Sequence, residues 1–149
     1  MSDVDLGHWT LADGLAFQAD AFSFIYAIKN KVTNKTYIGK KQMTSKRKLK
    51  PLKGKTRKRT QIKESDWRTY SGSSNELIAD KEKYGAENLE HLILKFTSCK
   101  WEAAYEELKE QILRDVIWKP EEFYNGILNI RLSRPPAHLI EARKLRETK

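Results

Sequence analysis

The sequence predicts a mixed α/β (α+β) fold in which a small sheet is flanked by helices. Two short hydrophobic runs, residues 22–29 and 35–40, are separated by a polar stretch and predict paired strands. A third apolar run covers residues 89–96, and helical patterns cover residues 76–84 and 101–117. The resulting order of strand, strand, helix, strand and helix is typical of one sheet with helices packed around it.

The first two hydrophobic runs predict a β-hairpin. Aromatic and aliphatic residues crowd the segment FSFIYAIK, and in TYIGK β-branched residues surround a tyrosine before a glycine. The polar segment NKVTNK lies between the two runs and is typical of a turn. Because side chains alternate along a strand, we expect Tyr26 and Tyr37 to lie near each other on neighbouring strands.

The segment after residue 64 combines turn, helix and strand signals. Ser74 or Asn75 is expected to begin a helix over residues 76–84, and Gly85 is expected to end it. The apolar run at residues 89–96 then predicts a third strand.

A second helix is predicted over residues 101–117, whose sequence is WEAAYEELKEQILRDVI. Pro120 is expected to close it, and Pro135 and Pro136 are expected to begin a short basic helix near the C-terminus. The residues at helical spacing predict a buried apolar stripe. This stripe comprises Ala104, Leu108, Ile112 and Val116, widened by Tyr105 and Ile117.

Length and composition predict a single domain spanning residues 1–149. The lone Cys99 cannot form an intramolecular disulfide. The sequence shows neither a secretion signal nor an apolar run long enough to cross a bilayer. We therefore expect a cytoplasmic protein without a membrane partner.

The charge pattern predicts a polyanionic partner. The net charge is +9 and the pI is near 9.6. Residues 40–63 contain no acidic residue, and with Pro51 and Gly54 they are expected to form a loop or ribbon that orders on nucleic acid. A nuclear-localisation signal is the alternative, but a position directly after a predicted strand favours substrate binding. Basic side chains bind DNA through its phosphates, so we expect strong salt dependence and little base preference.

An Ile-Tyr pair ending at Tyr26 and a Tyr-Ile-Gly run ending at Gly39 resemble the paired signature of the GIY-YIG nucleases, with Phe24 in place of the first glycine. The segments YIGKKQ, DWRTYSGSS, KYG, YEELKEQ and YN extend the resemblance over about residues 22–129, to free-standing, phage-borne, homing-type members. The resemblance implies the GIY-YIG nuclease fold, a small three-stranded antiparallel sheet flanked by helices. It also implies a metal-dependent DNA endonuclease.

The helix segment YEELKEQ offers three glutamates for a metal site. Glu107 and Glu110 share a face of the predicted helix, and Glu106 points elsewhere. The family pattern places a glutamine four residues after the glutamate, so Gln111 selects Glu107, with Glu110 as the alternative. The resemblance implies that Glu107 binds Mg²⁺ or Mn²⁺, because hard cations prefer carboxylate oxygens.

The resemblance also implies roles for other side chains. Either Tyr26 or Tyr37 is expected to take a proton from the attacking water, and the other to position the water or the phosphate. An arginine is expected on the phosphate, because its planar fork suits two oxygens, and Arg47 and Arg68 are equal candidates. Asn125 matches a late asparagine of the family that shapes the site, and turn formation with the following glycine is its alternative role.

We therefore predict a metal-dependent endonuclease that acts on double-stranded DNA. The alternative is a basic nucleic-acid-binding module that keeps the same fold without cutting, and charge alone also allows RNA as the partner. The predicted domain comprises a core at about residues 22–129, a basic DNA-binding insertion at residues 40–63 and a short basic tail at residues 133–149. The predicted DNA contacts are Gly39, Lys40, Lys41, Lys46, Lys48, Lys53, Lys55, Arg57, Lys58, Arg59 and Trp67.

Overall fold

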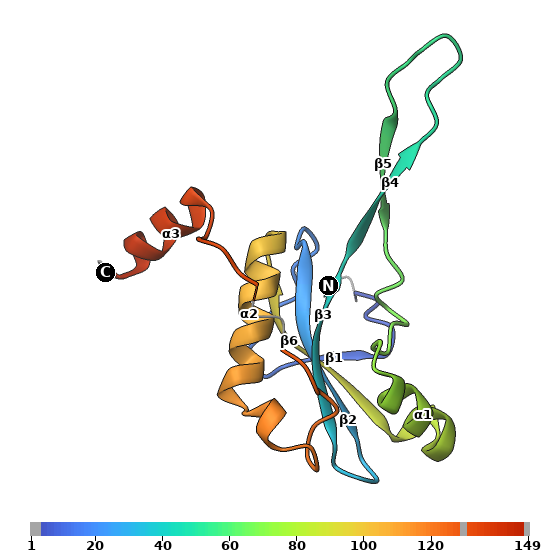
Figure 1. Ribbon diagram of the computed structural model, residues 1–149, viewed down its shortest axis with the longest axis vertical. Coiled ribbons are helices and arrows are strands. Elements are labelled where there is room, and N and C mark those ends of the chain that lie inside the picture. The colour runs from blue at the N-terminus through green and yellow to red at the C-terminus, as the bar shows by residue number, and fades with distance from the viewer. Residues whose placement is uncertain (1–3, 129–130, 148–149) are drawn as a thin grey trace.

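A computed structural model describes residues 4–128 and 131–147 of the chain. Its central feature is a four-stranded sheet with the strand order β1-β6-β2-β3 (Figure 1). The predicted domain limits at residues 1 and 149, and the predicted end of the core at residue 129, lie outside the described residues. The strands of this sheet are β1 (Trp9–Leu11), β2 (Ser23–Asn30), β3 (Thr36–Gln42) and β6 (Leu89–Thr97).

Strands β2, β3 and β6 form the three-stranded antiparallel arrangement that the sequence predicts. The hairpin register sets Tyr26 opposite Gly39 and Ala27 opposite Ile38. Strand β6 pairs antiparallel with the other side of β2. The fourth strand, β1, lies parallel to β6 and was not predicted, because three residues are too few to show an alternating pattern.

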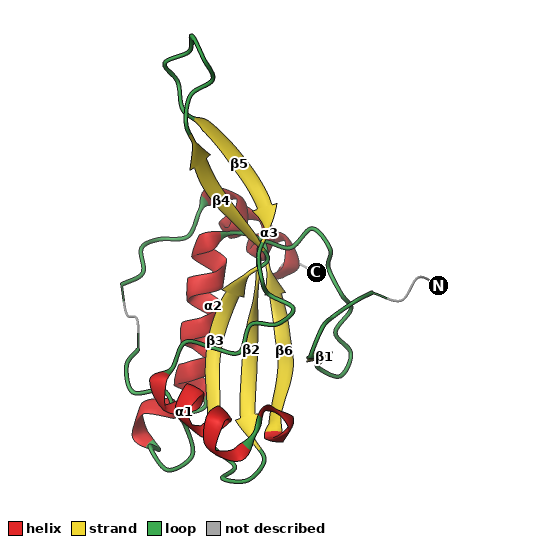
Figure 2. Ribbon diagram, turned by 90° about the vertical axis from the view of Figure 1, so that its right-hand side faces the viewer, coloured by secondary structure: helices red, strands yellow, loops and turns green. Residues whose placement is uncertain are grey.

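Three α-helices and two short 3₁₀ helices accompany the sheet within the described ranges 4–128 and 131–147. Helix α2 packs across β2, β3 and β6 (Figures 1 and 2). In the same ranges no helix is long and apolar enough to span a membrane. The helices are α1 (Asn75–Tyr84), η1 (Ala86–Asn88), α2 (Lys100–Leu113), η2 (Val116–Trp118) and α3 (Ala137–Glu147).

Helix α1 begins and ends where the sequence predicts. The hydroxyl of Ser74 accepts a hydrogen bond from the N–H of Leu77, which is the N-cap interaction expected of a serine at this position. Gly85 follows the last turn with φ of 94°, a conformation that favours glycine. The short basic helix after Pro136 is also present, as α3.

Helix α2 is shorter than predicted and presents a different face to the sheet. It ends at Leu113, and Asp115 then adopts the left-handed conformation with φ of 54°. Ile112, expected in the buried stripe, is 53% exposed, whereas Ala103 and Gln111 are buried. The predicted apolar stripe is therefore wrong at Ile112 and Ile117, which are exposed, whereas Val116 is buried as predicted. The polar side chain of Gln111 faces the sheet in its place.

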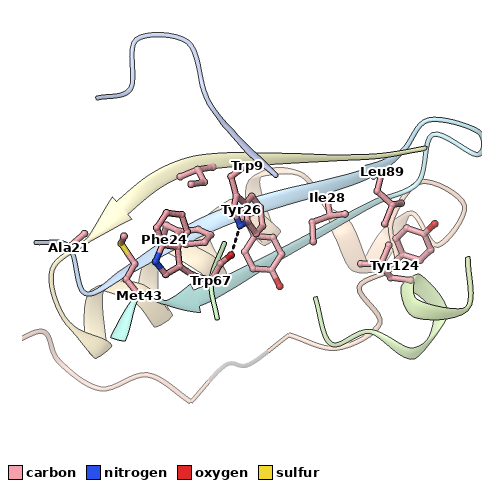
Figure 3. Close-up of a cluster of buried hydrophobic side chains, with 11 residues drawn as sticks. Trp9, Ala21, Phe24, Tyr26, Ile28, Met43, Trp67, Leu89 and Tyr124 are labelled. Carbon is pink, nitrogen blue, oxygen red and sulfur yellow. Dashed lines mark hydrogen bonds between the residues drawn. The ribbon is translucent and has the colours of Figure 1, made fainter. Parts of the chain in front are cut away.

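One face of the sheet carries an aromatic core (Figure 3). Phe24 packs edge-on against Trp9 and Trp67, with ring centroids 5.0 and 5.9 Å away. The indole N–H of Trp9 donates to the backbone oxygen of Trp67, and Tyr26 belongs to the same cluster. The family's first glycine is thus replaced here by a core residue, and aromatic burial joins the N-terminal segment, β2 and the chain after residue 65.

The opposite face of the sheet holds a second, smaller core. Ile25 of β2 and Ile38 of β3 are fully buried together with Val116 of η2. Because side chains alternate along a strand, Ile25 and Tyr26 point to opposite faces. The neighbours Tyr37 and Ile38 likewise point to opposite faces, so β3 lies between two packed layers.

The basic segment forms a separate two-stranded sheet. Strand β4 (Thr44–Leu49) follows β3 after one residue and pairs antiparallel with β5 (Arg59–Glu64). The hairpin β4–β5 projects from one end of the main sheet, away from the remaining elements (Figures 1 and 2). The segment is a ribbon and not a helix, as predicted. Its two strands pair in the protein without any bound nucleic acid, whereas the sequence predicted a segment that orders on nucleic acid.

His91, on β6, is a buried titratable side chain. Its ring stacks on that of His8 with centroids 3.6 Å apart, and its Nε2 lies 2.6 Å from the hydroxyl oxygen of Ser71. Burial first, and then the electrostatic influence of His8 and Lys81, lowers the pKa of His91 from 6.5 to about 4. As the pH falls, the unfolded chain therefore binds a proton at this residue before the folded protein does.

We expect the free energy of unfolding to decrease by on the order of 1–2 kcal/mol between about pH 7 and about pH 5, because the unfolded state binds more protons in this window. Urea denaturation at the two pH values measures the difference. The decrease should shrink in His91→Gln and persist in His138→Gln, a control on the exposed face of α3. An unchanged decrease in His91→Gln would contradict this assignment.

Candidate active site at the sheet edge

Strand β3 is the edge of the main sheet, and its outward-facing backbone groups find partners in later parts of the chain. Thr36 donates its N–H to the oxygen of Glu122 and accepts a hydrogen bond from the N–H of Tyr124, each at 2.9 Å. The next outward-facing residues of β3 are Ile38 and Lys40, because these groups alternate along a strand. Unpaired backbone groups at an edge are costly when buried, so these residues require partners.

Two side-chain amides pair with the backbone of Ile38. The Oδ1 of Asn125 accepts its N–H at 3.0 Å, and the Nδ2 of Asn125 donates to its oxygen at 2.8 Å. The Nε2 of Gln111, on α2, donates to the same oxygen at 3.1 Å. All three residues are buried, so these bonds fix α2 and the chain after Tyr124 against β3.

Glu107 lies one helical turn before Gln111 and reaches the next outward position of β3. Its carboxylate accepts a hydrogen bond from the N–H of Lys40. The Nζ of Lys40 lies 3.9 Å from its Oε1, and the Glu107 side chain is only 16% exposed. Burial raises the pKa of Glu107, and Lys40 acts in the opposite direction. A largely desolvated carboxylate thus stands at the sheet edge.

Tyr37 approaches the same edge from the other face of the sheet. Its ring lies 6.0 Å from that of Tyr26, between centroids, and its hydroxyl is hydrogen-bonded to Ser73. Burial raises the pKa of Tyr37, the bond to Ser73 lowers it, and the electrostatic influence of Glu107 and Tyr70 raises it further. The phenol is therefore protonated at neutral pH in the chain alone.

The ring of Tyr26 occupies the space above Gly39. A Cβ atom built on Gly39 would lie 2.5 Å from the hydroxyl oxygen of Tyr26 and 3.0 Å from a ring carbon of Tyr37. The hydroxyl of Tyr26 is hydrogen-bonded to Tyr70, and only 1% of Tyr26 is exposed. Burial, followed by the influence of Tyr70 and Tyr37, raises the pKa of Tyr26 strongly, so its hydroxyl is neutral.

An open pocket of about 700 Å³ lies beside this edge of the sheet. Its walls come from β3, α2, the residue before α1 and the chain after Phe123. The lining residues are Tyr37, Ser74, Glu107, Gln111, Tyr124, Asn125, Gly126, Ile127, Leu128 and Arg131. Three of the predicted site residues, Tyr37, Glu107 and Asn125, therefore border one pocket.

Residues 9–128 match the protein family described as "Putative endonuclease segE, GIY-YIG domain". The chain belongs to the GIY-YIG endonuclease family. The match confirms the resemblance seen in the sequence and agrees with the mixed α/β fold. This GIY-YIG protein is a nuclease, which hydrolyses phosphodiester bonds, and its substrate is a nucleic acid. No curated protein and no solved structure matches the chain.

Two arginines predicted to contact the phosphate lie outside the pocket of this nuclease. Arg47 is exposed on β4 and pairs with Gln61 of β5. Arg68 forms an ion pair with Glu64, and its guanidinium lies 4.4 Å from the ring centre of Trp67. The cations that the structure brings to the site are instead Lys40, beside Glu107, and Arg131, in the lining of the pocket.

Arg131, Tyr70 and Ser73 were missed as site residues by sequence reasoning. Arg131 borders the pocket and follows the Asn-Gly turn, but no pattern in the sequence marks it. Tyr70 and Ser73 belong to the segment DWRTYSGSS, which the resemblance includes without giving them roles. Their contacts with Tyr26 and Tyr37 form only in the folded protein. The one signal in the sequence that could have indicated them as site residues is the clustering of hydroxyl residues in this segment.

Two residues predicted to contact DNA are buried. Trp67 is 1% exposed, and its indole N–H donates to the carboxylate of Glu64 at 3.0 Å. Gly39 is buried beneath the ring of Tyr26. The prediction of DNA contacts by Trp67 and Gly39 is therefore corrected, because both residues serve the packing of the core.

The remaining predicted DNA contacts lie on the hairpin or at its base. Lys41 is held between two groups, with its Nζ 2.7 Å from a carboxylate oxygen of Asp66 and 4.2 Å from the ring centre of Tyr70. The others, apart from Lys40 beside Glu107, are exposed on β4, on β5 or in the loop between them. They are Lys46, Lys48, Lys53, Lys55, Arg57, Lys58 and Arg59.

The carboxylate of Glu107 fits a divalent cation of the Mg²⁺ type. Across residues 4–128 and 131–147, no group of three or more His, Cys, Asp and Glu side chains is placed to hold a metal. A single carboxylate suits Mg²⁺, which keeps several waters and takes further ligands from substrate phosphates. Asn125 uses its amide oxygen to accept the N–H of Ile38, so its observed role is to hold the edge of the sheet.

Replacing Gly39 by alanine tests the packing of Tyr26 over β3. We expect Gly39→Ala to lower the free energy of unfolding by about 1–3 kcal/mol, because the buried ring has no room to move away from the new methyl group. Urea denaturation measures the change. Gly126→Ala is the matched control, since no atom lies within 4 Å of a Cβ built there. Equal stability of the two variants would show that Tyr26 does not depend on Gly39.

Proposed function

We propose that this nuclease is a divalent-metal-dependent endonuclease that cleaves double-stranded DNA at the edge of β3. The observation that carries the proposal is the largely buried carboxylate of Glu107, which shares a pocket with Tyr37 and stands beside Lys40. An acidic ligand, a phenol and a cation around one opening are the groups that phosphodiester hydrolysis requires.

Glu107 is the proposed metal ligand, in preference to the other glutamates of α2. Glu110 is engaged by Lys95 and Arg114, each at 3.1 Å, and Glu106 is engaged by Lys95 at 2.7 Å. Glu107 instead faces the pocket, and its cationic neighbour is 3.9 Å away. Bound there, Mg²⁺ or Mn²⁺ supplies charge stabilisation to the phosphoryl oxygens and to the departing sugar oxygen.

Tyr37 is the tyrosine proposed to contact the reacting groups. It borders the pocket, whereas Tyr26 is buried behind it and hydrogen-bonded to Tyr70. As a neutral phenol, Tyr37 can donate a hydrogen bond to a phosphate oxygen or orient the attacking water. For Tyr37 to act as a base, as the resemblance implies, positive charge at the pocket must overcome the raised pKa of its phenol.

Lys40 and Arg131 are the proposed phosphate-binding cations of the site. Arg131 lines the pocket and Lys40 stands beside Glu107, whereas Arg47 lies on the hairpin and Arg68 is paired with Glu64. An arginine at the rim suits a bidentate contact with a phosphate, and a lysine acts there as a point charge. Asn125 takes the role of shaping the site through its two bonds to the backbone of Ile38.

Double-stranded DNA is the proposed substrate because a long basic hairpin projects from the end of the strand that carries Tyr37. Phosphate neutralisation by its lysines and arginines favours a nucleic-acid duplex and makes binding dependent on salt. A homing-type role and a location in the host cytoplasm are predictions from the sequence. They rest on its resemblance to free-standing phage members of the family.

Cleavage of supercoiled plasmid tests the proposal. Wild-type protein should relax or linearise the plasmid with Mg²⁺ or Mn²⁺ and should be inactive in EDTA. Glu107→Gln should cut at least about 100-fold more slowly while it still shifts the plasmid on a gel, because it keeps the shape but loses the charge that holds the metal. Glu110→Gln, on the same helix, is the matched control and should keep its activity.

Two outcomes would contradict the proposal. Equal activity of Glu107→Gln and Glu110→Gln would remove Glu107 from the site. Binding of the plasmid by the wild type without cutting under any metal would favour the non-catalytic binding module.

A further inference from the structure

The two faces of the hairpin β4–β5 carry different side chains. Directly opposed residues share a face, and successive pairs alternate between faces. On one face Arg47 lies opposite Gln61, with Arg59 and Lys63 on the same face in the neighbouring pairs. We call this face, defined by Arg47, Arg59 and Gln61, the arginine face. All of β5 and most of β4 are exposed, so the arginine face is open to a ligand.

The opposite face carries lysine and no arginine. Lys46 lies opposite Ile62, and Lys48 lies opposite Thr60. Both lysines are exposed. We call this the lysine face, defined by Lys46 and Lys48.

The chemistry of the two faces differs in a way that matters for DNA. Arginine and lysine can both contact guanine, and glutamine can contact adenine, at base edges in the major groove. Arginine differs in its rigid planar fork, which matches two acceptors at once, whereas lysine is a flexible point charge. Within the described part of the chain no hydrogen bond or ion pair engages the side chains of Arg47, Arg59 and Gln61. The side chains that suit two-point contacts with base edges best are thus gathered on one face and are not used by the protein itself.

We propose that the hairpin enters the major groove of duplex DNA with its arginine face toward the base edges, while lysines of the hairpin contact the flanking phosphates. The major groove, about 12 Å wide, admits a two-stranded ribbon. Charge complementarity selects this partner, since the segment carries twelve basic residues and no acidic residue between Lys40 and Lys63. The inference rests on the proposed function, which supplies double-stranded DNA as the substrate, and adds a preference for base sequence to it.

The geometry of the chain also places this contact relative to the cut. Strands β3 and β4 are separated only by Met43, so the hairpin continues directly from the strand that carries Tyr37. At a rise of about 3.3 Å per residue, the chain spans no more than about 33 Å from Tyr37 to Arg47 and about 40 Å from Tyr37 to Leu49, which lies opposite Arg59. One turn of B-DNA is about 34–36 Å. The preferred bases are therefore expected within about twelve base pairs of the cleaved bond, on one side of it.

Selection from a library of short randomised DNA duplexes tests the proposal. The full chain with Glu107→Gln, in EDTA, binds without cutting, so the assay reports binding alone. We expect an enriched sequence, and binding to it that exceeds binding to a scrambled duplex by at least about 10-fold. Within the same background, Arg47→Ala with Arg59→Ala should abolish this preference.

Lys46→Ala with Lys48→Ala is the matched control, because it also removes two positive charges from the hairpin, but from its lysine face. It should weaken binding to both duplexes and reduce the slope of log K against log salt by about 2, while the preference remains. All four side chains are exposed, and circular dichroism should show unchanged folding in both double variants.

Several outcomes would overturn the inference. They are the absence of an enriched sequence, equal loss of preference in both double variants, or tighter binding to RNA than to DNA of the same sequence. These failures are distinct from failure of the proposed function: metal-dependent plasmid cleavage without an enriched sequence overturns only the inference. An enriched sequence without cleavage by the wild type supports the inference and overturns the proposed catalytic role.

Discussion

The backbone of the edge strand β3 is the constraint on which the candidate active site depends. Its outward-facing groups belong to Ile38, which is fully buried, and to Thr36 and Lys40, which are half-buried, so they need partners within the protein. The chain after Lys119, the amides of Asn125 and Gln111 and the carboxylate of Glu107 satisfy them in turn. By pairing with one strand, these segments bring Glu107 to the opening beside Tyr37. The polar face of α2 is thus required by the strand that it covers.

The same constraint explains what sequence reasoning could and could not predict. The hairpin with Tyr26 and Tyr37 and the ends of helix α1 follow from alternation and capping residues, which act over a few neighbouring positions. The buried face of α2 could not be predicted, because an apolar periodicity does not reveal that Gln111 must bind a distant carbonyl oxygen. The positions of Arg68 and Arg131 depend likewise on contacts formed only in the fold.

The fold separates the two tasks of a nuclease along one continuous stretch of chain. Strand β3 carries Tyr37 at the pocket and Lys40 beside Glu107, the acidic group of the pocket. This carboxylate is largely desolvated, which strengthens its electrostatic interactions. The hairpin β4–β5 places the densest positive charge beyond the end of the sheet, where water and salt screen it. In the proposed function, burial therefore governs the chemistry at the sheet edge, and exposed charge governs substrate binding at the hairpin.

The most direct test of a metal-binding active site at the edge of β3 is the anomalous scattering of Mn²⁺ in crystals of the wild-type protein soaked with this ion. We expect a peak within about 2.0–2.3 Å of the carboxylate of Glu107, in the pocket bordered by Tyr37, and no such peak in Glu107→Gln. A peak at Glu106 or Glu110, or a peak that persists in Glu107→Gln, would contradict a site built on the edge of β3.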